Sequence, residues 1–340
     1  MADSQNELIE LLQQGKFLEE SSVPRHIETV ISHVFVFPTK AYKFYKTNNY
    51  EFNDGFRNLA DQRERFLFTQ KDFEWNKALS PSIYLELIPV TVRDGLVQRV
   101  DLDAADELLF DMKTIDLKDV LYERIVDGRI DEHVAFFIGK ELAQTLKKVR
   151  SPLTDTYDYY TLFDDRIRDA VSWLKLAEKH IPTKEAQSYV QFLRDFKEYY
   201  RDLFKGELSN EITYNGDIHS FNALLTNNEF FLMDTYPPKE EWMIEHHSTA
   251  LYRIATDILV LTGDWKLFDA CLAGYEEGYG SKINRTLDPF FIFYAGSLAC
   301  AYFYMLADAD ASKAASAQKY HAFMTAYLTE QESNIPKQDS

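Results

Sequence analysis

The sequence predicts an α+β fold with two unequal lobes, and three patterns along the chain indicate it. Four short runs rich in β-branched and aromatic residues lie before residue 101, which is typical of strands. From about residue 117 onward, apolar residues recur mostly at helical spacing. The stretch 212–234 interrupts this helical part with a loop and a hairpin pattern. We therefore expect a strand-rich lobe at 1–112 and a larger helical lobe at 113–335.

In the first lobe, an initial helical pattern at Leu8, Leu11 and Leu12 is followed by strands and one long helix. The helix is predicted to end before Pro81, because the residue before a proline disfavours helical geometry. Asp94-Gly95 between two apolar runs predicts a tight hairpin, and Pro89 predicts an edge strand or a bulge. The predicted strands are 30–37, 41–46, 83–92 and 96–100, and the predicted helix is 56–79.

The second lobe is predicted to be helical apart from its hairpin. The helical patterns cover 117–125, 134–146, 167–177, 189–204, 249–262, 265–278, 288–306 and 314–329. The uncharged stretch 290–306 is shorter than the roughly 20 apolar residues that a membrane span needs. We therefore expect a buried core helix there.

Composition excludes several classes of protein. The 340 residues include 55 acidic and 37 basic side chains, for a formal net charge of −18. This surplus argues against nucleic acid or an anionic membrane as the partner, because phosphate groups recruit lysine and arginine. Two cysteines make a disulfide framework or a structural zinc site improbable. The polar, acidic N-terminus is unlike a secretory signal, so we expect a cytoplasmic protein. No pattern indicates an oligomeric state.

The segment 214–234 carries the clearest chemistry. Asp217 and Asn222 lie in or at the end of a polar loop that enters a strand, and Asp234 ends the return strand. Because a hairpin brings its two ends together, we expect Asp234 to lie near the loop. Oxygen ligands of this kind suit Mg²⁺ bridged to phosphates, with one carboxylate left to accept a proton.

The spacing Asp217-x-x-x-x-Asn222, with an aspartate after a short hairpin, resembles the catalytic and metal-binding loops of the protein-kinase-like superfamily. The form Gly216-Asp217-Ile218-His219 is closest to its aminoglycoside phosphotransferase and choline kinase branch. The stretches 28–35 and 41–43 are similar to small-lobe strands of that branch, and 76–85 is similar to its helix-to-strand passage. The resemblance covers about residues 27–262 and implies a bilobal kinase-like fold.

The resemblance also implies roles for single residues. Asp217 would be the catalytic base for an acceptor hydroxyl, and Asn222 and Asp234 would hold Mg²⁺. Lys43 would contact the phosphates of ATP, with an acidic partner on the long helix. The acidic partner would be Asp72 or Glu74, and Asp72 matches better by its spacing to Leu79. The segment 108–112 would be the hinge that faces adenine, with Leu109, Phe110 and Met112 as the candidate contacts.

The implied function is ATP-dependent phosphorylation of a hydroxyl group on a small molecule, with Mg²⁺ as metal. The acidic net charge favours a cationic acceptor, while aminoglycoside, choline, sugar, amino alcohol and nucleoside all stay open. The sequence departs from the family at three places: Asn215 stands where the branch has histidine, 35–40 has no glycine-rich loop, and Asp72 is shorter than the usual glutamate. These departures motivate the alternative of a weak or inactive kinase-like nucleotide-binding or interaction protein.

Other polar residues have structural interpretations. Asp257 is expected to pin its helix to the catalytic loop, and His219 to order that loop. His246 and His247, which follow acidic residues at 240, 241 and 245, could suggest metal ligands, but adjacent side chains point apart in a helix or strand. We therefore expect both histidines to be solvated loop residues.

Overall fold

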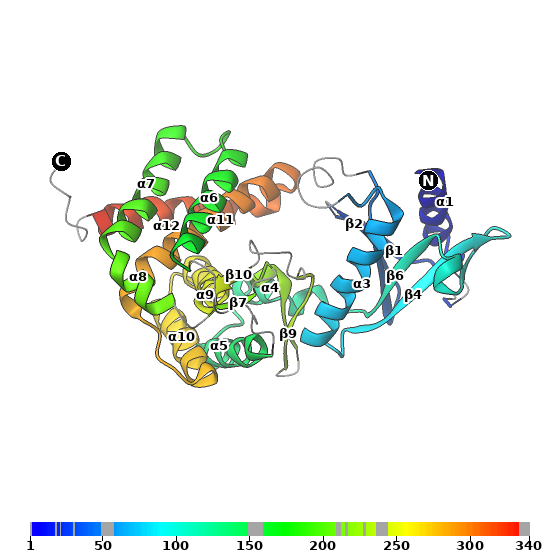
Figure 1. Ribbon diagram of the computed structural model, residues 1–340, viewed down its shortest axis with the longest axis horizontal. Helices are drawn as coiled ribbons and strands as arrows, with labels where there is room; N and C mark the ends of the chain where they lie inside the picture. Colours follow the sequence, from blue (N-terminus) through cyan, green and yellow to red (C-terminus); the bar gives the residue numbers. More distant parts are fainter. Residues whose placement is uncertain are drawn as a thin grey trace. The chain divides into compact units, whose positions relative to one another are not determined.

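The computed structural model describes residues 2–17, 19–20, 22–29, 31–48, 58–148, 159–208, 212–214, 217–226, 229–235 and 244–332. The chain divides into two compact units (Figure 1). The first unit comprises Met1–Leu117 and Phe231–Pro237, and the second comprises Lys118–Phe230 and Pro238–Ser340. Residues 231–237, which begin within the second strand of the predicted hairpin, therefore belong to the first unit.

The first unit is built on a six-stranded antiparallel sheet in the order β1-β2-β3-β6-β4-β5. The predicted hairpin at Asp94-Gly95 is confirmed, with φ of 53° and 70° at its two central residues, as a type I′ turn requires. The strands are β1 Arg25–Glu28, β2 Ser32–Val36, β3 Lys40–Tyr45, β4 Tyr84–Arg93, β5 Leu96–Arg99 and β6 Glu107–Lys113.

Helices cover both faces of this sheet (Figure 1). Helix α1 (Ala2–Gln13) packs its leucines against Tyr42 and Phe44 in one apolar core. Helix α3 (Gln62–Leu79) lies on the opposite face, where the Tyr45 hydroxyl meets a side chain of the helix. Since side chains alternate along a strand, Lys43 also points to the α3 face. The alternation of β3 thus aims the predicted phosphate-binding lysine at α3.

Three details of the first unit differ from the sequence predictions. Helix α3 begins at Gln62, not near 56, because Asp61 caps it by accepting a hydrogen bond from the Glu64 N–H. Strand β1 was not predicted. Strand β4 is not at an edge, since it lies between β6 and β5, and its register shift falls between Tyr84 and Glu86 and not at Pro89.

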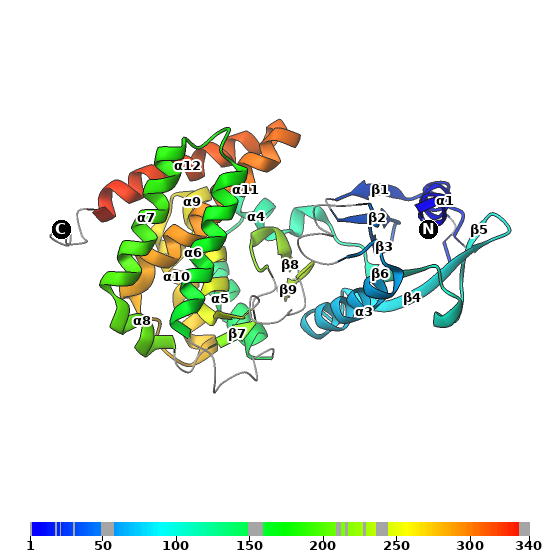
Figure 2. The same ribbon diagram turned by 45° about the horizontal axis from the view of Figure 1, so that its top comes forward.

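The second unit is mainly helical, as predicted (Figure 2). Two small antiparallel pairs, β7 with β10 and β8 with β9, accompany the helices, and the division between the units falls within β9 after Phe230. The elements are α4 Leu121–Val126, α5 Glu132–Lys147, α6 Tyr159–Leu176, α7 Thr183–Tyr199, α8 Arg201–Leu208, β7 Ile212–Tyr214, β8 Ala223–Thr226, β9 Glu229–Leu232, β10 Ile244–His246, α9 His247–Thr262, α10 Trp265–Tyr279, α11 Asp288–Ala309 and α12 Ala314–Glu332.

Helix α11 forms the centre of the second unit and packs against α6, α9 and α12. By length and composition alone, the segment Arg285–Asp308 could cross a membrane. However, 67% of its most apolar window is buried within the protein, and Phe290, Phe293 and Cys300 have no exposed surface. This burial is what the sequence predicts for a core helix.

Candidate active site

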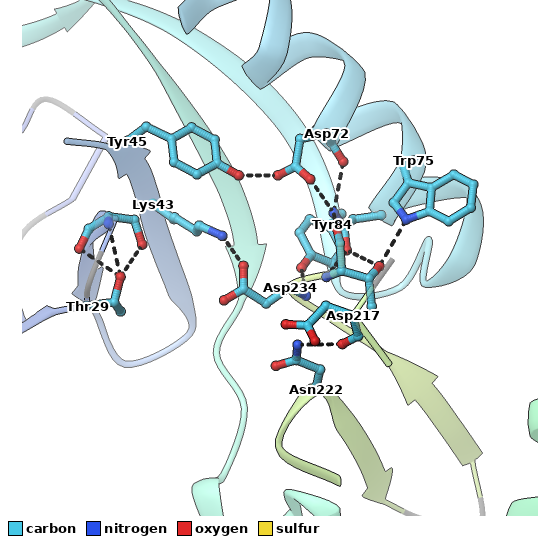
Figure 3. A network of polar contacts seen from close by, with 12 residues as sticks. Thr29, Lys43, Tyr45, Asp72, Trp75, Tyr84, Asp217, Asn222 and Asp234 are labelled. Carbon is cyan, nitrogen blue, oxygen red and sulfur yellow. Dashed lines mark hydrogen bonds and ion pairs between the residues drawn. The ribbon is translucent and has the colours of Figure 1, made fainter. Parts of the chain in front are cut away.

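Lys43 is a buried cation on the face of the sheet that α3 covers (Figure 3). Its side chain is 6% exposed, and its ammonium group forms an ion pair with the carboxylate of Asp234. The ammonium also lies 5.2 Å and 5.5 Å from the ring centroids of Tyr45 and Phe110. Burial lowers the pKa of Lys43, but the charges of Asp234 and Asp72 outweigh it and raise the pKa. The lysine is therefore held in its charged form.

Asp72 is the α3 carboxylate on the sheet side of the helix, and it is buried. It accepts hydrogen bonds from the Tyr45 hydroxyl at 2.5 Å and from the Asn76 amide at 3.0 Å. Burial raises the pKa of Asp72 to about 7, although Lys43 pulls it down. Lys43 therefore touches Asp234 directly, whereas Asp72 acts on the lysine through its charge. Glu74, the other predicted partner, is exposed on the far side of the helix.

The segment that carries Asp234 is fastened to the end of α3 and the start of β4 (Figure 3). The Asp234 N–H donates to the Tyr84 hydroxyl at 2.8 Å. Asn76 donates to the Thr235 carbonyl at 2.7 Å and accepts from the Thr235 N–H at 3.1 Å. The Ser80 hydroxyl donates to the Leu232 carbonyl at 2.5 Å. These bonds fix the backbone on both sides of the predicted metal ligand.

Asp217 lies in a second polar cluster, within the second unit. Its Oδ1 pairs with Arg253 Nη1 at 2.8 Å, and its Oδ2 lies 3.5 Å from His219 Nε2. Burial raises the pKa of Asp217, but His219 and Arg253 outweigh this effect and hold the pKa well below its usual range. Asp217 is thus a carboxylate at any physiological pH, and 41% of its side chain is exposed.

The loop after Asp217 is ordered from within. Asn222 donates its side-chain N–H to the Asp217 carbonyl at 3.0 Å, and the His219 ring accepts from the Phe221 N–H at 3.3 Å. Asp257 on α9 accepts from the Ser220 N–H at 3.2 Å and also from the Tyr320 hydroxyl. The loop-ordering roles expected for His219 and Asp257 agree with these contacts.

Both predicted aspartates have an unusual backbone. Among the described residues, the non-glycine positions with positive φ are Asp94 of the hairpin, Asp217 at 65° and Asp234 at 52°. A left-handed conformation costs free energy in a residue with a side chain, and such strain concentrates at functional sites. The two aspartates that the motif selects are therefore also the two that the fold strains outside a tight turn.

The structure sorts the predicted residues into two groups. Lys43, Asp72 and Asp234 lie together in the first unit, and Asp217 lies with Asn222 in the second. The predicted hinge is strand β6, a central strand of the sheet. Phe110 pairs with Lys43 in register and shares its face, as does Met112 by alternation, whereas Leu109 packs in the core on the α1 face. Asn215 and Gly216 lie outside the described residues.

Several contact residues were missed by the sequence analysis. Arg253 precedes Asp257 by one helical turn, so both face the catalytic loop. Asn76, Ser80 and Tyr84 recur every fourth residue in the segment 76–85 that resembled the family. This spacing could have indicated that the three residues act together. However, the segment that they bind, residues 232–235, lies about 150 residues later in the chain, and the spacing does not reveal it.

The expectation for the histidine pair was wrong. His246 and His247 are 7% and 4% exposed. His246 caps α9 by accepting from the Ser248 N–H, and His247 stacks on Tyr275 and Tyr279. Aromatic side chains of α10 pack on His247, and Phe291 of α11 stacks on His246. Local sequence does not show these neighbours.

The oxygen donors fit a hard divalent cation. Asp234 offers a carboxylate that is 49% exposed, and Asn222 directs its amide N–H to the backbone, so its oxygen is the end suited to a metal. Carboxylate and amide oxygens are the ligands that Mg²⁺ accepts beside phosphate and water. Oxygen donors of these two kinds suit Mg²⁺ better than zinc, which favours nitrogen and sulfur ligands.

Comparison with solved structures identifies the fold. No family model matches the sequence, and no curated protein matches it at a significant level. A choline kinase from Cryptosporidium parvum Iowa II aligns with a TM-score of 0.53 at 10% identity, over 97% of this chain and 96% of that chain. A choline/ethanolamine kinase family protein from Mesorhizobium loti aligns with a TM-score of 0.52 at 10% identity, over 95% of this chain and 94% of that chain. A choline kinase from Streptococcus pneumoniae aligns with a TM-score of 0.51 at 10% identity, over 96% of this chain and 99% of that chain. The predicted bilobal, kinase-like fold is therefore confirmed.

Proposed function

We propose that the protein is an ATP-dependent phosphotransferase that acts on a hydroxyl group of a small molecule. The observation that carries the proposal is the ion pair between the buried Lys43 and the half-exposed Asp234, which are 191 residues apart. It joins the lysine expected to bind phosphate to the aspartate expected to bind the metal. The fold of the matched small-molecule kinases supports the proposal.

In the proposed reaction, Asp217 accepts the hydrogen bond of the acceptor hydroxyl and then its proton. The hydroxyl oxygen bonds to the γ-phosphorus of ATP, the bond from that phosphorus to the bridging oxygen breaks, and ADP leaves. Bound Mg²⁺ would neutralise charge on the phosphate oxygens, with Asn222 and Asp234 as its protein ligands. Lys43 would leave Asp234 for the phosphates, and Phe110 and Met112 would lie towards adenine.

A second candidate is a kinase-like protein that binds nucleotide without turnover. The connection between β2 and β3 favours it, since Phe37 and Lys40 close a tight turn around Pro38 and Thr39. This turn has no glycine, and Pro38 has no N–H, so it lacks the backbone donors that cradle phosphate in a glycine-rich loop. Binding of Mg-ATP without any product would support this candidate.

The first test replaces the proposed base. Asp217→Asn keeps the shape of the side chain but cannot accept a proton, so turnover should fall by about 100-fold or more while Mg-ATP affinity is retained. Product is measured by ³¹P NMR over a panel of hydroxyl compounds, and affinity by calorimetry. An Asp217→Asn protein as active as wild type would refute the role of Asp217.

The second test concerns nucleotide binding. Lys43→Met should weaken Mg-ATP binding by about tenfold or more, because it removes a charge-assisted contact to phosphate. Lys40→Met is the matched control, since Lys40 is on the same strand, is 36% exposed and pairs with Asp111 on the opposite face. Equal effects of the two variants, or no Mg-ATP binding to wild type at millimolar nucleotide, would overturn the proposal.

A further inference from the structure

Helices α7, α11 and α12 pack against one another in the second unit (Figure 2), and a hydrogen-bonded chain of three side chains joins them. The chain runs from Glu185 on α7 through His321 on α12 to Tyr304 on α11. Glu185 Oε1 lies 3.0 Å from His321 Nε2, and His321 Nδ1 lies 2.7 Å from the Tyr304 hydroxyl. None of the three residues takes part in the proposed phosphoryl transfer.

The hydrogen bonds fix which nitrogen of His321 carries the proton. Burial raises the pKa of Glu185, but its three hydrogen-bond donors outweigh this effect and lower the pKa. The donors are Tyr189, Thr325 and His321. Glu185 is therefore an ionised carboxylate, which can only accept, so His321 Nε2 donates and Nδ1 of the neutral ring accepts from the Tyr304 hydroxyl. Carboxylate, histidine and hydroxyl in this order are the arrangement that activates a nucleophile.

The Tyr304 ring is held from its other side as well. It stacks on His180, with ring centroids 4.6 Å apart and planes 3° from parallel, and His180 pairs with Asp308 at 2.9 Å. Burial raises the pKa of Tyr304, so its hydroxyl keeps its proton at neutral pH. Attack by this oxygen therefore needs a base to take the proton, and His321 is within hydrogen-bond reach.

Tyr304 and His321 line an open groove of about 510 Å³ along α12. Ala322 and Ala326 give the groove an apolar wall, and Gln318, one turn before His321, adds a side-chain amide. The seven lining residues include no lysine, arginine, aspartate or glutamate. Phosphoryl transfer needs cations to neutralise the phosphate oxygens, whereas acyl transfer needs a neutral donor for one carbonyl oxygen. The groove therefore suits an apolar acyl compound.

We propose that this groove is a second active site, in which Tyr304 attacks the carbonyl carbon of an ester that carries a short apolar acyl group. His321 is the general base, Glu185 orients it, and Gln318 donates to the carbonyl oxygen. The acyl group lies along Ala322 and Ala326. This acyl transfer goes beyond the proposed kinase function and does not depend on it.

In the first half of the reaction, a bond forms between the tyrosyl oxygen and the carbonyl carbon while His321 Nδ1 takes the hydroxyl proton. The bond from that carbon to the alcohol oxygen then breaks, and the alcohol leaves with the proton from His321. In the second half, water attacks the acyl-tyrosine and gives its proton to His321. The carboxylic acid departs, and His321 returns the proton to the Tyr304 oxygen.

The probe is p-nitrophenyl acetate. The wild type should release a burst of about one p-nitrophenol per chain, the signature of an acyl-enzyme, and mass spectrometry should locate one acetyl group on Tyr304. Tyr304→Phe keeps the ring that stacks on His180 but should abolish the burst. His321→Gln keeps a polar side chain that is no base, and it should slow acetylation of Tyr304 by about 100-fold or more.

Matched controls come from the same unit. His133 is exposed on α5, and Tyr199 is 44% exposed on α7. His133→Gln and Tyr199→Phe should both keep the full burst, because neither residue lines the groove. Thermal unfolding shows whether each variant is folded.

An undiminished burst in Tyr304→Phe, equal acetylation rates in His321→Gln and wild type, or acetyl groups spread evenly over exposed tyrosines and lysines would overturn the inference. If His321→Gln does not fold, the burst in Tyr304→Phe and the position of the acetyl group decide. The proposed kinase function is measured separately, through Mg-ATP binding in calorimetry, and its failure would leave the burst unchanged.

Discussion

One basic side chain, Lys43, and two acidic side chains, Asp72 and Asp234, lie close together in the first unit. Lys43 pairs with Asp234, so Asp72 is left to hydrogen bonds from Tyr45 and Asn76. Burial raises the pKa of Asp72 to about 7, because the charged form loses hydration that one shared lysine replaces only in part. A carboxylate one methylene shorter than glutamate thus binds its neighbours on the sheet and helix, and the lysine pairs with Asp234.

This raised pKa predicts a pH dependence of stability. The folded state binds the Asp72 proton up to about pH 7, whereas an unfolded aspartate releases it near pH 3.9. Between these values the folded state holds more protons, so this residue's contribution to the unfolding free energy falls as pH rises through the window and is constant above it. Asp72→Asn has no such proton, and its stability relative to wild type should therefore increase from about pH 4 to about pH 8.

Urea unfolding of both proteins at several pH values measures this difference. Glu74→Gln is the matched control, because Glu74 is exposed on the same helix. Parallel stability curves for wild type and Asp72→Asn would contradict the raised pKa. From the sequence alone, either Asp72 or Glu74 could be the acidic partner of Lys43, because which face of a helix is buried depends on what packs against it.

At the scale of elements, the end of α3 and the start of β4 act as a clamp on residues 232–235. Asn76 satisfies both the N–H and the carbonyl of Thr235, and Tyr84 accepts from the Asp234 N–H. Asp234 is strained at φ 52°, so its position depends on these bonds. The clamp therefore fixes the backbone that carries Asp234, the proposed metal ligand.

Removing the clamp should affect both stability and binding. Asn76→Ala leaves the buried Thr235 backbone groups without their partner, which should lower the unfolding free energy by about 2 kcal/mol or more. Mg-ATP affinity should also fall, since Asp234 is no longer held. Lys71→Ala, an exposed position on the same helix, is the control and should change stability by less than about 0.5 kcal/mol. Unchanged Mg-ATP affinity in a folded Asn76→Ala protein would show that the clamp does not position Asp234.

Local sequence sufficed for several elements. The Asp94-Gly95 turn follows from two residues that tolerate positive φ, and α5 and α11 follow from their apolar patterns. Strand β1, the edge of the sheet, was missed because Arg25–Glu28 is short and polar. Strand β6 was taken for a hinge, because an apolar run bounded by charges does not show which strands will pair with it.

At the scale of the whole molecule, the net charge of −18 opposes the binding of an anion such as ATP. Lys43 supplies one compensating charge, and it is already paired with Asp234. A divalent cation on Asn222 and Asp234 would supply the rest and would release Lys43 from its partner. The charge balance thus predicts that the proposed nucleotide binding depends on the metal.

Chelation of Mg²⁺ with EDTA should therefore weaken ATP binding by about tenfold or more. Without Mg²⁺, raising the ionic strength to about 0.5 M should restore part of the lost ATP affinity, because salt screens the repulsion between ATP and the acidic protein. Asp234→Asn should lose most of the Mg²⁺ effect. Glu277→Gln, which removes one exposed charge elsewhere, should keep it. Calorimetry checks all four, and equal affinities with and without Mg²⁺ would refute the metal dependence.

The sequence by itself predicted the fold class, which the structure confirms, and its resemblance to the kinase-like family implied roles for Asp217, Asn222, Asp234 and Lys43. The fold class follows from patterns repeated within single elements, and the motif follows from residues close together in the chain. Only the tertiary structure decided that Lys43 pairs with Asp234, that Asp72 and not Glu74 faces the sheet, and that Leu109 points away from Lys43. It alone placed Arg253 on Asp217 and Asn76 on Thr235. These contacts join residues 36 to 191 positions apart, and such pairings depend on how helices and strands pack, which no local pattern encodes.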